Sequence, residues 1–413
     1  MAKKLCVAAL GVILSAGIAA VSFAFIIAET YLTDLVWHTP FAHGQFAIVH
    51  HVIVCAIGLA IVFALKQHWG DLPHTTHDSM AELKRSHSAS YHHVWRSLIV
   101  AIAILVTGAG VGPEASLLGA IIALSIFQAD KLRYLYHHFD EFQKASWGTK
   151  FAYAFHPHQY LLPFNAAQYR INKRKKQALV SLFIINGVVM FTLLMRLAHQ
   201  PSFVTRVGQT DWQLHDLIIL PLLCLAGAVV GKLYMGVRRA SSALAKHIHI
   251  SRLSKLSIGV LAIFAMSAFA PELLFSGQHE ISFVIDAWTL YPAWVLLLLA
   301  MGKLIFLDIC NWSGWIGGDI FPILFSSLLL GFSAAQLMPT YDTLLVCIVV
   351  AVSVSTMMVD LPWVMCIIVA LFFPLSLLPI AVLATALLQG VRWGITKVMK
   401  LVHIPTSKSV SHH

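Results

Sequence analysis

The sequence predicts an all-α protein that crosses a membrane many times, and three observations carry this prediction. Of its 413 residues, 59% are hydrophobic and only 11% are charged, a balance that the core of a water-soluble protein could not bury. Apolar runs of about twenty residues, the length that a bilayer requires, recur along the chain. Two of these runs are interrupted by glycine, proline and an acid, which indicates broken helices near the middle of the bilayer.

The first apolar run, residues 5–28, follows Lys3 and Lys4 and is too long for the apolar region of a cleaved signal peptide. We therefore interpret it as the first membrane helix. Within the run at 217–235, Gly227 and Gly231 have the spacing that favours close helix packing. The further apolar runs are, in chain order, 46–65, 98–127, 178–197, 217–235, 256–275, 288–309, 314–335 and 344–388.

Some of these runs carry interruptions that set their expected limits. The run at 98–127 is cut near its middle, and each fragment is shorter than a span. The run at 344–388 contains Pro362, Pro374 and Pro379, which we expect at kinks or helix boundaries.

Basic residues gather in the connections between the apolar runs, at 3–4, 66–96, 170–176 and 238–255. If these connections share one side of the membrane, that side is cytoplasmic. This pattern explains the net charge of +10 without nucleic acid, which we do not expect as a partner. We divide the single transmembrane domain into a first half (1–200, with a basic polar insert at about 129–176), a second half (201–392) and a short, loosely ordered polar tail (393–413).

The second broken run is residues 314–330, GWIGGDIFPILFSSLLL. Gly317 and Gly318 leave the backbone free to turn, and a helix is predicted to start near Asp319. The first N–H groups of such a helix have no partner within it, and its end carries about half a positive charge. The sequence therefore predicts a helix end that attracts an anion.

The first broken run repeats this arrangement at residues 108–119, GAGVGPEASLLG. Gly110 and Gly112 loosen the backbone, Pro113 suits the first position of a helix, and Glu114 follows in the first turn. Two such interruptions are typical of a substrate site at the midplane of a membrane transporter.

Three motifs resemble the CLC family of chloride channels and proton-coupled chloride transporters. Residues 112–116, GPEAS, resemble its GxExP motif, residues 313–322, SGWIGGDIFP, resemble its SGxxGGxxxP segment, and residues 70–73, GDLP, resemble its GSGIP segment. Through order and spacing the resemblance covers about residues 66–127 and 177–335. It implies an inverted repeat whose broken helices meet at a midplane anion site, and a homodimer with one pore per subunit. The chain resembles a divergent member of the family, without CBS domains.

The resemblance implies that Glu114 is a gating glutamate, whose carboxylate can occupy an anion position and swing away. The residues alone leave a second interpretation, in which Glu114 only complements the helix dipole. The family pattern gives the backbone N–H groups of Asp319 and Ile320 as anion donors. The full set of expected anion-binding positions is Gly70, Gly112, Pro113, Gly317, Gly318, Asp319 and Ile320.

The chain departs from the family pattern at several of these positions. Asp319 stands where the family has an apolar residue, so we expect its side chain to point away or to pair with a base such as Lys303. Lys303 either raises the positive potential of the anion path or extends to the membrane interface. Gly70 replaces the serine of GSGIP, Ser116 replaces the final proline of GxExP, and the family's C-terminal pore tyrosine has no counterpart.

Between about residues 129 and 170, where the family has an inner proton-relaying glutamate, we identify no acid in a matching apolar helix. Asp140 and Glu141 have the context of surface residues. We therefore expect passive, gated chloride conduction in a multi-pass protein of a bacterial cell membrane. The alternatives are a proton-coupled chloride or fluoride antiporter and, in another class, a membrane enzyme or scaffold that uses residues 129–176.

The expected partners are an inorganic anion, membrane lipid and a second copy of the chain. We expect no enzymatic activity and no cofactor, with chloride as the transported ion. The 22 histidines and six cysteines show no spacing of a metal-ligand set, so no metal site is expected either.

Overall fold

The structure, a computed structural model, describes residues 2–42, 44–86, 90–163, 173–199, 206–248, 250–278 and 280–402. Within these ranges the chain is helical and forms no β-sheet. Nine of the described helical segments are long and apolar enough to cross a membrane. The predicted class, an all-α multi-pass membrane protein, is therefore confirmed. The start of the basic cluster at 170–172 and most of the predicted tail, from 403 onward, lie outside the described residues.

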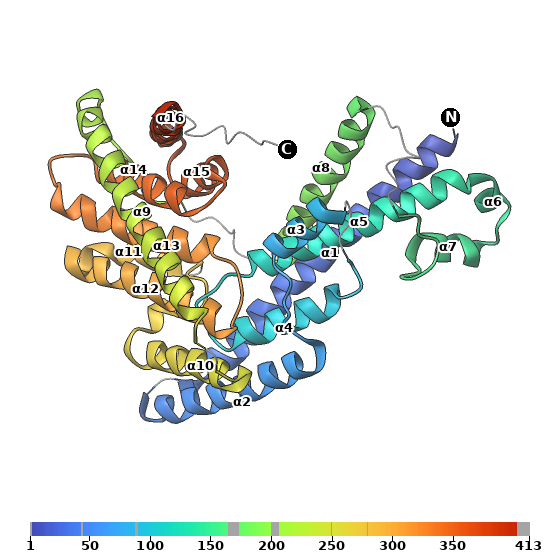
Figure 1. Cartoon of the computed structure of the whole chain (residues 1–413), viewed down its shortest axis with the longest axis horizontal. Coiled ribbons are helices and arrows are strands. Elements are labelled where there is room, and N and C mark those ends of the chain that lie inside the picture. Colours follow the sequence, from blue (N-terminus) through green and yellow to red (C-terminus); the bar gives the residue numbers. More distant parts are fainter. Residues whose placement is uncertain are drawn as a thin grey trace, which may run out of the picture. The chain divides into compact units, whose positions relative to one another are not determined.

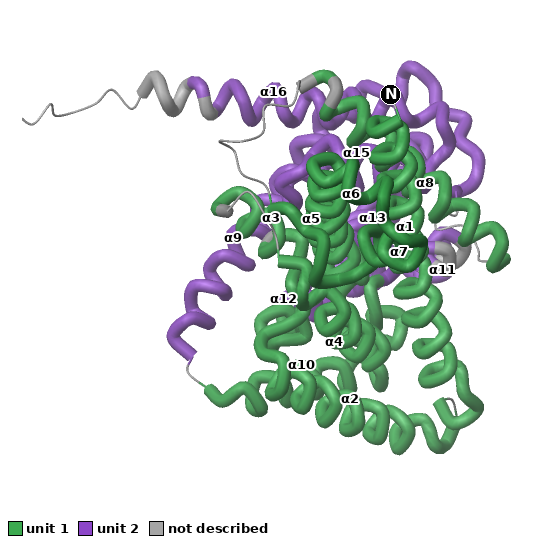
Figure 2. The backbone as a smooth tube through the Cα atoms, turned by 90° about the vertical axis from the view of Figure 1, so that its right-hand side faces the viewer, with its two compact units in different colours: residues 1–202, 250–276, 309–319 green, residues 203–249, 277–308, 320–413 purple. Residues whose placement is uncertain are grey.

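The chain forms two compact units, which are coloured separately in Figure 2. Unit 1 contains Met1–Ser202, Ile250–Ser276 and Ile309–Asp319, and unit 2 contains Phe203–His249, Gly277–Asp308 and Ile320–His413. Unit 1 therefore combines the first half of the sequence with two segments of the second half. As a result, both predicted helix breaks lie in unit 1. The division into sequence halves stays a prediction.

Unit 1 is organised around its first helix, α1, which packs against α8, α5 and α4 (Figure 1). A second group in this unit joins α2 to α10 and α4. The helices are α1 (Ala2–Trp37), α2 (Ala47–Trp69), α3 (Thr76–Ser86), α4 (Val94–Val106), α5 (Glu114–His137), α6 (Phe139–Lys144), α7 (Trp147–Phe155), α8 (Lys173–Leu197) and α10 (Arg252–Phe269), with 3-10 turns at Pro40–Ala42, Gly44–Phe46 and Pro271–Leu273.

Helix α5 corrects one prediction, that both fragments of the run at 98–127 are too short to span. Helix α4 has 13 residues, but α5 has 24 and continues to His137. The polar residues near its end are buried because each has a partner. The side-chain amide of Gln128 donates to the carbonyl of Gly11 at 2.7 Å, and Lys131 Nζ donates to the carbonyl of Gln159 at 2.7 Å. Satisfied polar groups can continue a helix that hydropathy alone would end.

Unit 2 has its core in α13 and α14, which are apolar and buried on nearly every side. Helix α9 packs on α14 through the small residues that the sequence singled out. A Cβ atom at Gly227 would lie 2.6 Å from Ser353 Cβ, and one at Gly231 would lie 2.8 Å from Met357 Cβ. The predicted close packing of this helix is thus confirmed.

The helices of unit 2 are α9 (Leu220–Ala245), α11 (Glu280–Ala287), α12 (Ala293–Ser313), α13 (Ile320–Leu337), α14 (Thr343–Met358), α15 (Pro362–Leu371) and α16 (Leu378–Val402), with 3-10 turns at Leu214–Ile219, Trp288–Leu290 and Leu375–Leu377. The last residues of α12 belong to unit 1. Pro362 begins α15, Pro374 precedes a 3-10 turn, and Pro379 lies in the first turn of α16. The three prolines therefore mark helix boundaries, as predicted.

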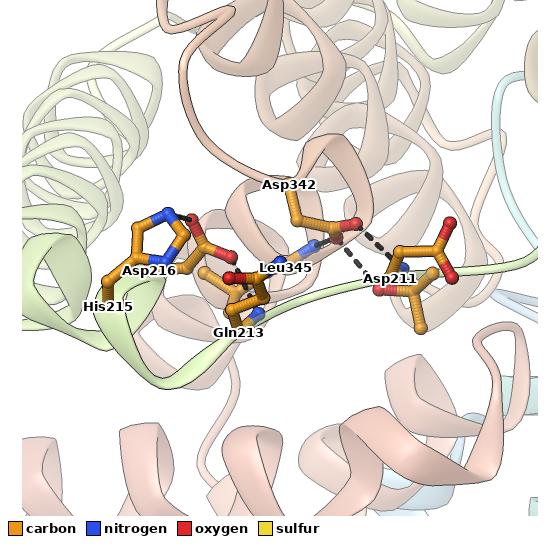
Figure 3. Close-up of polar contacts among 7 residues, drawn as sticks. Asp211, Gln213, His215, Asp216, Asp342 and Leu345 are labelled. Atoms are coloured by element: carbon orange, nitrogen blue, oxygen red, sulfur yellow. Dashed lines mark hydrogen bonds and ion pairs between the residues drawn. The ribbon is translucent and has the colours of Figure 1, made fainter.

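A polar connection in unit 2 is fastened to the start of α14 by Asp342 (Figure 3). One oxygen of this carboxylate accepts the Leu345 N–H at 2.7 Å and the Thr210 hydroxyl at 2.9 Å. The other accepts the Asp211 N–H at 3.2 Å. Beside it, the Asp216 carboxylate accepts the Gln213 N–H at 2.8 Å. These acids satisfy backbone donors at helix starts and so have a structural role.

Candidate anion site at the two helix breaks

The first break lies between α4, which ends at Val106, and α5. Gly108 follows with φ +95°, a conformation that L side chains rarely adopt. The Trp37 indole N–H donates to the Val106 carbonyl at 2.8 Å and satisfies the end of α4. Further along, the Gly110 N–H lies 3.4 Å from Cys310 Sγ on α12. The break is thus a defined, hydrogen-bonded turn.

The second break is built in the same way, between α12, which ends at Ser313, and α13. Gly314 follows with φ +96°. Trp315, which is fully buried, donates its indole N–H to the Leu256 carbonyl on α10 at 3.0 Å. Gly259 on the same helix leaves room for this indole, since a Cβ atom there would collide with it. Each break therefore begins at a left-handed glycine and is anchored by a buried tryptophan.

The two breaks meet through their backbones at Gly112 and Gly318. The Gly112 N–H donates to the Gly318 carbonyl at 2.8 Å, and the Gly318 N–H donates to the Gly112 carbonyl at 2.7 Å. This reciprocal bridge joins segments that are far apart in the sequence. The N–H groups of Gly112 and Gly318 are both engaged in this bridge, and Pro113 has no N–H.

Glu114 is the first residue of α5, and its side chain turns back toward this bridge. Its carboxylate fills the space that a Cβ atom of either Gly112 or Gly318 would occupy. Both positions must therefore be glycine for the carboxylate to lie here. Gly317 has a similar requirement, because a Cβ atom there would lie 2.7 Å from Val111 Cβ. The acid of the first break thus rests against the second break.

Asp319 comes directly before α13, and its carboxylate is held by Asn311 on α12. The Asn311 side-chain N–H donates to Asp319 Oδ1 at 2.8 Å. The amide oxygen of Asn311 lies 3.4 Å from the Gly317 nitrogen, which donates to it. The sequence left open whether Asp319 points away or pairs with a base such as Lys303, and the structure shows a hydrogen bond to its carboxylate from Asn311. The sequence signal that was missed is a lone amide side chain at the end of an apolar helix.

Comparison with known proteins decides the family. Residues 171–391, more than half of the chain, match the sequence profile described as voltage gated chloride channel. The chain belongs to this family, the CLC family. A comparison with curated proteins found no match.

Two solved structures have the same fold as this CLC chain. A slow cyanobacterial Cl⁻/H⁺ antiporter has a TM-score of 0.70 and 15% identity, over 93% of this chain and 93% of that one. A CLC-type fluoride/proton antiporter has a TM-score of 0.63 and 18% identity, over 93% of this chain and 94% of that one. At these identities the likeness shows the fold, and the CLC-type architecture predicted from the motifs is confirmed.

The segment of this CLC chain that resembles GSGIP follows α2. Gly70 caps that helix with φ +86°, and its N–H donates to the Lys66 carbonyl at 3.0 Å. The buried Lys66 ammonium donates to the Leu72 carbonyl. Arg252 on α10 donates to the Lys66 carbonyl at 2.9 Å and lies 3.0 Å from the Asp71 carboxylate. Two cations that the site prediction did not include therefore hold the loop that contains Gly70.

The remaining predicted positions, Ile320 and Lys303, lie in unit 2. Ile320 is the first residue of α13, where the helix dipole is positive. Lys303 is fully buried on α12, and its ammonium lies 5.7 Å from the ring centroid of Phe325 and 6.0 Å from that of Phe306. It therefore does not extend to an interface, and the aromatic faces stabilise its charge.

Asp130 is a buried acid that the sequence analysis missed. It lies about four turns beyond Glu114 on α5, is 2% exposed, and accepts a hydrogen bond from Arg133 at 2.8 Å. The Tyr91 hydroxyl lies 3.4 Å from its other oxygen. Burial, and then the Asp130 carboxylate, raise the pKa of Tyr91.

The expectation that no acid lies in an apolar helix of this region is therefore wrong. Asp130 lies within the range, about 129–176, that the sequence analysis interprets as a polar insert, whereas in the structure it belongs to α5. Asp140 and Glu141, which were predicted at the surface, are indeed exposed.

Proposed function

We propose that this CLC chain carries chloride, or another small inorganic anion, across the membrane along a path gated by Glu114. The observation that supports this proposal best is the carboxylate of Glu114 against the bridge between Gly112 and Gly318. A carboxylate has the charge and the acceptor oxygens that an anion presents to the same surroundings. It can therefore occupy an anion position and leave it when it is protonated or displaced.

The residues around this carboxylate have separate parts in the proposed path. Gly112 and Gly318 provide the space into which the carboxylate, or an anion in its place, fits. The start of α13 supplies a positive helix end directly after Asp319. Asn311 holds the Asp319 carboxylate, so this second negative charge has a fixed partner close to the anion position.

We propose passive, gated conduction as the mode of transport, since a movable carboxylate is enough to open and close a path. Proton-coupled exchange is a second candidate, which two observations favour. Asp130 is a buried acid on the helix that begins with Glu114. In addition, both structures compared above are described as antiporters. The protein is proposed to act as a homodimer with one path in each subunit.

Flux from purified protein in liposomes tests the proposal and separates its two modes. A chloride gradient and a pH dye in the lumen are measured together, with fluoride run in parallel. Conduction dissipates the anion gradient without a matching proton movement, whereas exchange changes the lumenal pH in a fixed ratio to the anion moved. Flux of neither anion, from protein that elutes as one folded species, would overturn the proposal and favour a scaffold or an enzyme.

A further inference from the structure

Unit 1 contains a groove of about 480 Å³ between α1, α5 and α8. The three helices lie side by side (Figure 1) and are each long and apolar enough to span a bilayer. The groove therefore lies within the part of unit 1 that is expected to cross the bilayer. Residues that line it are almost all apolar or small, and include Ser22, Leu117, Ser125, Val180, Gly187 and Phe191.

The groove exists because α5 and α8 are both fastened to α1. Helix α8 is attached by Asn186, whose side-chain N–H donates to the Val12 carbonyl at 3.0 Å and lies 2.8 Å from Ser15 Oγ. Helix α5 is attached by Gln128, which donates to the Gly11 carbonyl at 2.7 Å. Small residues of α1, among them Ala19, then line the space between the two helices.

Lysines stand at one end of this groove. On α8, Lys176 is exposed and lies one turn before Val180, the first residue of this helix that lines the groove. It is on the same face of α8 as the lining residues Ile184 and Phe191. On α1, Lys4 is exposed and lies on the stripe that continues through Ser15 and Ser22.

The contact of a third lysine shows which end of α5 lies beside the basic end of the groove. Lys3 Nζ lies 4.4 Å from the ring centroid of Tyr136, near the C-terminal end of α5. The basic end of the groove therefore lies beside the end of α5, and Leu117 at its other end is one turn from Glu114. By the positive-inside rule the basic end is cytoplasmic.

We propose that this groove binds one acyl chain of an anionic phospholipid, whose phosphate lies between Lys4 and Lys176. An apolar slot within the bilayer with cations at its head complements such a lipid in both polarity and charge. The exposed lysines at its head favour an anionic headgroup over a helix of a second copy as the occupant. The inference does not depend on the proposed transport function.

Native mass spectrometry of the full chain tests the site, with phosphatidylglycerol and phosphatidylcholine offered as competing lipids. We expect the wild-type protein to retain one phosphatidylglycerol molecule in preference to phosphatidylcholine. Lys176→Ala should reduce that preference about fivefold, the equivalent of about 1 kcal/mol for one basic residue at an anionic surface. Arg174→Ala is the matched control, because two residues along a helix place its side chain on the other side of α8.

A second pair of variants tests the slot itself. Ser125→Phe fills the groove and should abolish retention of the lipid, whereas Val189→Phe, at an exposed position of α8 outside the lining, should not. Equal retention of both lipids by all variants would show that the protein associates with membrane lipid non-specifically, and would overturn the proposed site. A dimer that forms without lipid and is lost in Ser125→Phe would show that a second copy covers the groove, and would also overturn it.

Discussion

The two helix breaks of unit 1 share one construction but treat their acids differently. Each break starts at a left-handed glycine, and each is anchored by an indole N–H, from Trp37 in the first and from Trp315 in the second. Glu114, after the first break, has its carboxylate against the backbone bridge between the breaks. The difference lies in what each carboxylate is seen to contact, the backbone bridge for Glu114 and the side-chain amide of Asn311 for Asp319, and it bears on the gating role proposed for Glu114.

Asp319, at the end of the second break, is the contrasting acid, because Asn311 holds its carboxylate at 2.8 Å. A carboxylate with a fixed side-chain partner is restrained from moving, whereas the role proposed for Glu114 requires movement. The comparison of the two breaks yields four predictions.

The largest effect is expected from Gly318→Leu, which removes the space where the two breaks meet. A side chain there would collide with the Glu114 carboxylate and displace the bridge to Gly112. Anion flux in liposomes should fall at least about tenfold, which corresponds to about 1.4 kcal/mol in the barrier. Gly236→Leu on α9, where a Cβ atom meets nothing within 4 Å, is the control and should transport normally. Unchanged flux in Gly318→Leu would show that the bridge between Gly112 and Gly318 is not part of the anion path.

Glu114→Gln tests the gating role proposed for the acid of the first break. Protonation removes the charge that mimics an anion, so wild-type flux should rise as the pH falls. The variant is neutral at every pH, so its flux should largely lose this dependence while the protein stays folded. Flux is measured over a series of pH values, with Glu141→Gln, an exposed acid, as the control. A pH profile like that of the wild type would leave Glu114 with only the dipole-complementing role.

Asn311→Ala tests the restrained acid and should have an intermediate effect. Without the amide, the Asp319 carboxylate loses a charged hydrogen bond and becomes able to compete with an anion. We expect flux to fall about fivefold, the equivalent of about 1 kcal/mol, which is the net contribution of a typical hydrogen bond. Adding Asp319→Asn in the same chain should restore most of the flux, because the competing charge is gone. Failure of this rescue would mean that Asn311 acts only on the fold of the second break.

The smallest effect is expected from changes to the two tryptophan anchors, the feature that both breaks share. Trp37→Phe and Trp315→Phe each remove one indole donor from a buried carbonyl while they keep an aromatic ring. Each should lower the free energy of unfolding by about 1 kcal/mol, seen as a modest fall in the melting temperature in detergent. A fall for only one variant would show that the two anchors are not equivalent.

Much of this arrangement could be predicted from local sequence. Length and hydropathy predicted the membrane helices, and glycine, proline and acid together predicted both breaks. The motifs at 112–116 and 313–322 indicated the family, which the sequence profile and the fold then confirmed. These features depend on near neighbours in the chain, because helix length and backbone freedom are local properties.

Other features needed contacts between distant residues. The sequence assigned Asp130 to a polar insert, because it did not show that Arg133 and Tyr91 satisfy this acid within the end of α5. It also did not single out Asn311, which donates a hydrogen bond to the Asp319 carboxylate. Gly112 and Gly318 were predicted as anion-binding positions, and the sequence did not show that the N–H group of each donates to the carbonyl of the other.

The sequence by itself determined that this chain is a helical membrane protein of the CLC type with two broken helices. Only the tertiary structure decided which backbone groups the breaks share, where the carboxylate of Glu114 rests, and which side chain restrains Asp319. The physical reason is that a polar group within a membrane takes its role from the partner that satisfies it. That partner is set by how the helices pack.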